Sequence, residues 1–104
     1  MITQSNVTGD VSLFTVDNGQ TRWWGLRLLA TLVSGQGAVV SVRVNGSDPP
    51  LDEGGFFVHV DNTSYPARQG SKEILLNDGD VVTAHIDGGN VNLALSGEVL
   101  SEQL

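Results

Sequence analysis

The chain has 104 residues and a mass of 11.0 kDa, which predicts a single domain spanning residues 1–104. Twelve acidic residues against five Lys and Arg give a formal charge of -7 without any basic cluster, which argues against nucleic acid or an anionic membrane as a partner. Cysteine is absent, so the hydrophobic core alone must stabilise the fold. The first residues do not predict a secretory signal, and no apolar stretch is long enough to cross a bilayer.

The first two predicted strands are residues 11–16 and 23–33. Short segments in which apolar side chains alternate, separated by Gly, Asn, Asp and Pro, are typical of antiparallel β structure. The Leu and Ala content of residues 23–33 also suits a helix, but the alternation of its leucines favours a strand. We expect residues 34–37 to end this strand.

The clearest half-buried strand is predicted at residues 38–44. Its even-numbered valines lie on one face, and Ser41 and Arg43 lie on the other. A loop is expected over residues 45–55, because the two prolines within it remove backbone donors. A short strand, residues 56–60, follows.

The last third of the chain predicts further strands. Residues 63–72 form a polar stretch, and residues 81–86 alternate again, with Val82, Ala84 and Ile86 expected to face the core.

A hairpin is expected at residues 87–90, because Asp-Gly-Gly-Asn is typical of tight turns. It would join residues 81–86 to a strand at residues 91–95, and residues 96–100 complete the domain. The chain therefore predicts an all-β antiparallel sandwich of about seven or eight strands.

No catalytic, cofactor-binding or metal-ligating set can be assembled from the sequence, so we expect a protein that is not an enzyme and needs no cofactor. His59 and His85 fall at polar-facing positions on different strands and are interpreted as surface or sheet-packed imidazoles. Glu53, Glu73 and Glu98 are candidate carboxylates for glycoside hydrolysis, but sequence does not fix the separation that this chemistry requires.

Calcium is considered for two acidic segments. Asp78-Gly79-Asp80 with Asp87, or Asp61-Asn62, would supply oxygen ligands if loops brought them together. Asp-Gly is also common turn chemistry, and the spacing of a helix-loop-helix calcium site is absent from the sequence, so we prefer the turn interpretation.

Adjacent aromatic pairs offer candidate contact residues. Trp23 and Trp24 must point to opposite faces of a strand, as must Phe56 and Phe57, so one of each pair is expected in the core and the other outside. An outward aromatic more often marks a subunit contact than a sugar site. The candidate subunit contacts are Trp23 or Trp24, Leu51 and Phe57. The alternative is a carbohydrate-binding module that uses Trp24, Asp61, Asn62 and Tyr65.

Residues 74–82 and 93–100, with their Leu-x-x-Gly-Asp-x-Val and Ser-Gly segments, resemble the closing strands of trimeric jelly-roll heads of the complement and tumour-necrosis-factor type. The whole composition resembles that of small virion proteins of tailed bacteriophages. These resemblances imply a jelly-roll-like sandwich that forms a homotrimer and acts as a capsid decoration or tail-associated protein. They imply a location in the virion and a capsid or tail protein as partner. The carbohydrate-binding alternative implies a glycan partner and an extracellular or cell-surface location.

Overall fold

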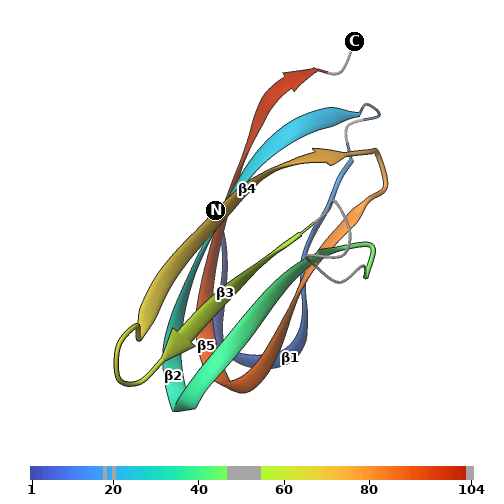
Figure 1. Cartoon of the computed structure of the whole chain (residues 1–104). Helices are drawn as coiled ribbons and strands as arrows, with labels where there is room; N and C mark the ends of the chain where they lie inside the picture. The colour runs from blue at the N-terminus through green and yellow to red at the C-terminus, as the bar shows by residue number, and fades with distance from the viewer. Residues whose placement is uncertain (18, 20, 47–54, 103–104) are drawn as a thin grey trace.

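The computed structural model describes residues 1–17, 19, 21–46 and 55–102 and is all-β, with no helix among them (Figure 1). Since no helix is present in these ranges, none is long and apolar enough to cross a membrane. The strands form one antiparallel sheet in the order β1-β5-β2-β3, and β4 also pairs with β2. The predicted all-β antiparallel fold is confirmed. The five strands are β1 (Ile2–Thr15), β2 (Arg22–Val44), β3 (Phe56–Asp61), β4 (Ala67–Leu76) and β5 (Val81–Glu102).

The sheet has two halves, because β3 and β4 share one edge of β2. β4 pairs with residues 22–31 of β2 and β3 pairs with residues 37–42, whereas β5 follows the other edge of β2. β1 pairs with the free edge of β5. The β4 half consists of β4 with residues 22–33, 90–102 and 2–7. The β3 half consists of β3 with residues 37–44, 81–88 and 9–15.

The three long strands bend between the two halves, and Figure 1 shows β2 and β5 reversing direction at the lower end of the molecule. Gly88 has a φ of +112°, and a Cβ built there would lie 2.6 Å from the carbonyl oxygen of Gly37. Only glycine allows β5 to approach β2 this closely. The bend brings β4 over β3, where a Cβ on Gly70 would lie 2.7 Å from Cγ2 of Val58.

The core lies between the inner faces of the two halves. All five strands contribute to it, and the predicted inward residues Val82, Ala84 and Ile86 are buried, which confirms that prediction. Each fully buried aliphatic side chain contributes roughly 1.5–3 kcal/mol. The largest fully buried side chains are Leu26, Leu28, Val40, Val42, Leu76, Val82, Ile86, Val91 and Leu95.

Two predicted boundaries are wrong. Residues 34–37 and 87–90 do not end strands but lie inside β2 and β5, so the structure has five strands where seven or eight were expected. Residues 81–86 and 91–95 consequently do not pair with each other as a hairpin; both pair with β1 and β2. The physical reason is that glycines with positive φ bend a strand as readily as they reverse it.

The polar stretch at residues 63–72, for which no strand was predicted, contains the first part of β4, which begins at Ala67. The first residues of β4 are polar, so the sequence shows no apolar alternation that would have predicted a strand there. β4 is an edge strand whose outer side faces solvent, where polar residues are favoured. On its inner side Gly70 gives β3 room, and Lys72 Nζ donates a 3.0 Å hydrogen bond to the carbonyl of Gly55.

Candidate functional site

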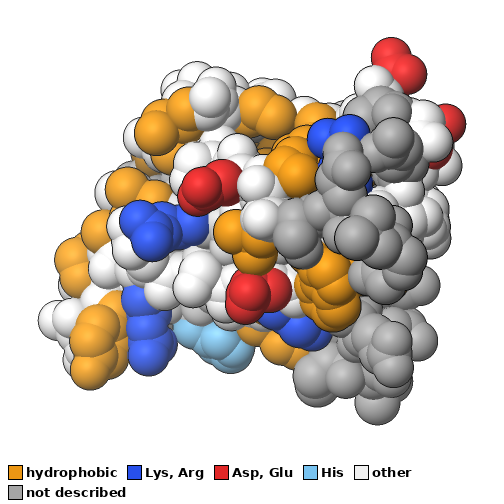
Figure 2. All heavy atoms as spheres, turned by 90° about the horizontal axis from the view of Figure 1, so that it is seen from above, with side chains coloured by type: hydrophobic (Ala, Val, Ile, Leu, Met, Phe, Trp, Pro, Cys, Tyr) orange, Lys and Arg blue, Asp and Glu red, His pale blue; other side chains and the backbone are white. Residues whose placement is uncertain are grey.

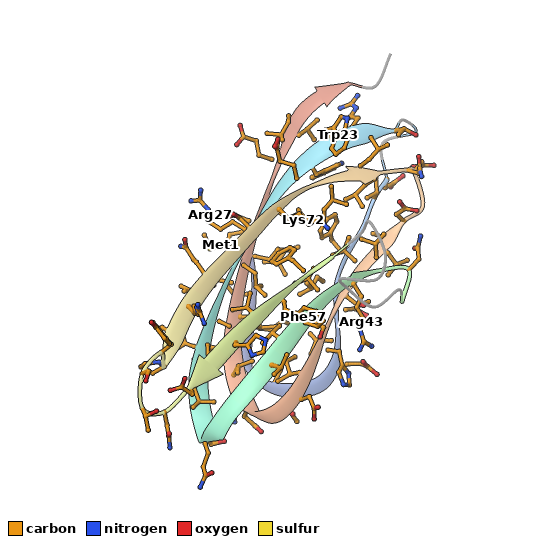
Figure 3. The ribbon with its side chains drawn as sticks, viewed as in Figure 1. Met1, Trp23, Arg27, Arg43, Phe57 and Lys72 are labelled. Atoms are coloured by element: carbon orange, nitrogen blue, oxygen red, sulfur yellow. The ribbon has the colours of Figure 1, made fainter. Side chains whose placement is uncertain are left out.

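Because the inner faces are filled by the core, the outer faces of the two halves are the surfaces available for function. On the β4 half, strand alternation points Trp23, Gly25, Arg27 and Leu29 of β2 outward. On the β3 half it points Ser41 and Arg43 outward, on the other side of the molecule. Figure 3 shows Arg27 and Arg43 projecting from opposite sides.

Exposed apolar side chains gather on the outer face of the β4 half. Trp23 is 39% exposed and stands directly opposite Leu75 of β4, which is 40% exposed. Leu29 and Leu100 are exposed to a similar extent. In the view from above, hydrophobic side chains alternate with acidic and basic ones (Figure 2). Such a mixed surface with an outward tryptophan is typical of a protein contact.

A groove of about 700 Å³ runs over Gly25 on this face, and we call it the Gly25 groove. Residue 25 has no side chain, so the backbone of β2 forms the floor. Glu73 of β4 and Glu98 of β5 both stand opposite Gly25, one on each side. Leu100 and Arg27 also line the groove, and a Cβ added at Gly25 would lie 3.4 Å from the Leu100 side chain.

Three charged side chains of the Gly25 groove, Arg27, Glu73 and Glu98, form no ion pair among the residues that the structure describes. Glu73 and Glu98 are two of the three carboxylates considered from sequence; the third, Glu53, lies outside the described residues. Lys72 also lines the groove, but its Nζ donates to the Gly55 carbonyl, so the charges offered to an external partner are those of Arg27, Glu73 and Glu98.

The outer face of the β3 half carries a row of four side chains. Phe57 of β3 stands opposite Ser41 of β2, Ser41 opposite His85 of β5, and His85 opposite Asp10 of β1. His85 Nδ1 lies 2.7 Å from Asp10 Oδ1. A carboxylate can only accept a hydrogen bond, so Nδ1 of His85 is protonated and donates a hydrogen bond to Asp10. The ring of Phe57 also meets the ring of His59 edge-on, at 6.4 Å between centroids.

This row brings together a hydroxyl, an imidazole and a carboxylate that sequence reasoning missed, because only the register reveals it. Acyl transfer requires more than the three groups. Ser41 is 6% exposed, and within the described ranges its hydroxyl makes no hydrogen bond to His85. β2 is also paired on both edges at Ser41, so its N–H groups belong to the sheet rather than to an oxyanion hole. The three groups are therefore not arranged as an acyl-transfer triad in this structure.

The aromatic pairs alternate as predicted. Trp24 and Phe56 pack against the core, whereas Trp23 and Phe57 are exposed, which confirms the expected inside-outside arrangement. The Trp24 ring lies 5.6 Å from that of Phe14, between centroids. Its Nε1 is buried and has no hydrogen-bond partner among the described residues.

Asp61, Asn62 and Tyr65 come together in the turn between β3 and β4. Asp61 Oδ1 accepts hydrogen bonds from the backbone N–H groups of Ser64, Thr63 and Tyr65 at 2.6, 2.9 and 3.3 Å, and from the Thr63 hydroxyl at 3.0 Å. These bonds, the one from Ser64 first, lower the pKa of Asp61 to about 2.

The carbohydrate candidates do not form one site with Trp24. Trp24 pairs with Ile74, at the end of β4 far from the turn, whereas Tyr65 lies beside the beginning of β4. Tyr65 is exposed, and the Arg68 guanidinium lies 4.6 Å above its ring. Leu51, the remaining candidate contact, lies outside the described residues.

Of the remaining aspartates considered for calcium, Asp87 lies inside β5, whereas Asp78 and Asp80 accept hydrogen bonds that hold turns together. Asp78 Oδ1 accepts from the Gly19 N–H at 3.0 Å, and Asp80 accepts from Asn45 Nδ2 at 2.9 Å and from the Asn77 N–H at 2.8 Å. In the described ranges, no group of three or more His, Asp or Glu side chains is placed to hold a metal ion.

No protein-family model and no curated protein matches the sequence of this chain. Its function must therefore be inferred from its own surfaces, of which the outer face of the β4 half combines exposed apolar groups with unpaired charges.

Proposed function

We propose that the chain is a non-enzymatic structural module that binds copies of itself through the outer face of the β4 half. The observation that carries the proposal is the exposure of Trp23, Leu75, Leu29 and Leu100 on one face of a domain whose core is otherwise complete. Covering the exposed part of each side chain would contribute roughly 1 kcal/mol. Aromatic residues are enriched in the buried centres of protein interfaces, and Trp23 fits that position.

We propose further that the module belongs to a larger particle, as a capsid decoration or tail-associated protein of a bacteriophage virion. The acidic, cysteine-free composition supports this setting, because it keeps free copies soluble without disulfides. The homotrimer expected from the sequence is supported only by the resemblance to trimeric jelly-roll heads.

We also propose that the fold is a jelly-roll sandwich. If β1, β2 and β5 are each counted as two segments at their bends, the β4 half has the order β1-β5-β2-β4 and the β3 half has the order β1-β5-β2-β3. The first strand thus pairs with the last in both halves. In a jelly roll, a long antiparallel hairpin is bent over so that its two parts form two packed sheets, and this gives the same strand order. The order therefore supports a jelly roll of eight segments.

Self-association is tested by sedimentation equilibrium from micromolar to submillimolar concentration. The proposal predicts a mass that rises from 11.0 kDa to a multiple of it. Trp23→Ser should shift the population back to the single chain, whereas Phe57→Ser, an equally exposed aromatic on the other half, should not. A single chain at every concentration would overturn the proposal.

A carbohydrate-binding module is the second candidate. It is favoured by the turn that holds Asp61 and Asn62, where Asp61 accepts from the Tyr65 backbone N–H and the Tyr65 ring is exposed. Aromatic rings of this kind stack on the apolar faces of sugars. A glycan array tests it: binding that Tyr65→Ala abolishes would support it, and no binding to any glycan class would exclude it.

A further inference from the structure

We propose that two copies pair face to face through the β4 half, so that Arg27 of each copy enters the Gly25 groove of the other. The inference rests on the proposed self-association and names the partner: a second copy related by a two-fold axis. The axis lies between the two faces, at right angles to the strands, and passes over Leu26.

The positions along β2 match under this axis. Gly25 and Arg27 point outward and lie about 7 Å apart on the strand. Rotation about an axis over Leu26 exchanges them, so that Arg27 of one copy faces Gly25 of the other. The same rotation places Trp23 of one copy against Leu29 of the other, and both side chains are apolar and exposed.

The neighbouring strands match as well. In the row through Gly25, the flanking residues are Glu73 and Glu98. In the row through Arg27, the flanking residues are serines, Ser71 on β4 and Ser96 on β5. The axis keeps β4 over β4 and β5 over β5. The Gly25 row of one copy therefore faces the Arg27 row of the other.

The two rows complement each other in shape and in charge. One has a glycine between two long acidic side chains, and the other has a long basic side chain between two small serines. A guanidinium presents N–H donors on both of its edges, so Arg27 can bind the partner copy's carboxylates on either side of the groove. The serine hydroxyls provide further donors to the same carboxylates.

The other simple two-fold arrangement is unfavourable. An axis parallel to β2 would place Arg27 on Arg27, and Glu73 of each copy on Glu98 of the other. Like charges in contact disfavour such a pairing. Because Arg27, Glu73 and Glu98 form no ion pair with one another or with other described residues, the antiparallel arrangement gives all three a partner.

A charge-swap experiment on the full chain tests the pairing. Arg27→Glu alone, and Glu73→Arg with Glu98→Arg, should each weaken association about tenfold or more, because like charges then meet at both grooves. An equimolar mixture of the two variants should restore association as a mixed dimer, since each groove again holds opposite charges. Arg68→Glu makes the same charge change as Arg27→Glu, outside the groove, and should leave association unchanged.

Gly25→Ser provides a test without any change of charge. Its Cβ would contact Leu100 at an ordinary 3.4 Å, so the chain should fold. The serine side chain would then occupy the space into which Arg27 of the other copy is proposed to enter. We expect the wild type to form dimers and Gly25→Ser to remain a single chain. A wild-type trimer that Arg27→Glu leaves intact, or a mixture that fails to reassociate, would overturn the two-fold pairing while self-association stands. A wild type that is monomeric at every concentration would overturn both.

Discussion

The two halves of the molecule share one core but present different outer faces. On the β3 half, polar groups meet within the chain: His85 donates to Asp10, and Ser41 is buried beside them. On the β4 half, Arg27 and Glu73 stand in adjacent rows without pairing, among exposed apolar side chains. The outer face of the β3 half thus holds a hydrogen-bonded polar pair, whereas Arg27 and Glu73 on the β4 half form no ion pair with described residues, which is why we propose the β4 half as the contact surface.

The largest expected effect on the free energy of unfolding comes from replacing a side chain on the inner side of the β4 half, compared with its neighbour on the outer side. Leu28→Ala should lower the free energy of unfolding by about 2–5 kcal/mol, because its side chain is fully buried. Leu29→Ala, one residue further on the exposed side, should cost less than about 0.5 kcal/mol in the single chain. Urea denaturation at low protein concentration measures both. Equal losses would show that the alternation of β2 is misassigned.

The bend between the halves gives the next largest effect. Gly88→Ala should cost about 3 kcal/mol or more, because it combines a positive φ with a clash against the Gly37 carbonyl. Gly9→Ala, also at a positive φ but in open space, should cost only about 1–2 kcal/mol. Denaturation of the two variants measures the difference. If Gly88→Ala costs no more than Gly9→Ala, β5 does not approach β2 as described.

A smaller effect is expected from the paired face of the β3 half. Asp10→Ala removes the acceptor of His85 and should lower the free energy of unfolding by less than about 1 kcal/mol, because the pair is exposed to solvent. The mass in solution should stay that of the wild type. A change of mass would mean that the β3 half, too, takes part in association.

The smallest effect is local to the turn at Asp61. The pKa of Asp61 is lowered to about 2, so its stabilising bonds are complete above the ordinary value of about 3.9 and are lost as pH falls through about 2. A titration of this carboxyl group by NMR should have its midpoint near 2, and Asp61→Asn should remove the transition. A midpoint near 4 would contradict the hydrogen bonding described for the turn.

Alternation allowed the sequence to predict which side chains face the core. It placed Val82, Ala84 and Ile86 inside and separated Trp23 from Trp24, because neighbouring residues of a strand must point to opposite sides.

The bends could not be predicted, because Asp-Gly-Gly-Asn suits a hairpin and a bend equally well. What decides between them is the strand opposite: Gly88 lies against Gly37, and the chain continues. The start of β4 was missed because its polar residues resemble a loop. The Gly25 groove requires the register of three segments distant in sequence, so Glu73 and Glu98 were noticed as carboxylates but not as neighbours of Gly25.

The two tryptophans of the chain provide the most direct test of the contact surface. Their indole N–H signals can be followed by NMR while the protein is diluted from submillimolar to micromolar concentration. We predict that the Trp23 signal shifts with concentration and that the Trp24 signal, which comes from the inner side, stays in place. Two signals that do not change, or a change confined to Trp24, would contradict association through the outer face of the β4 half.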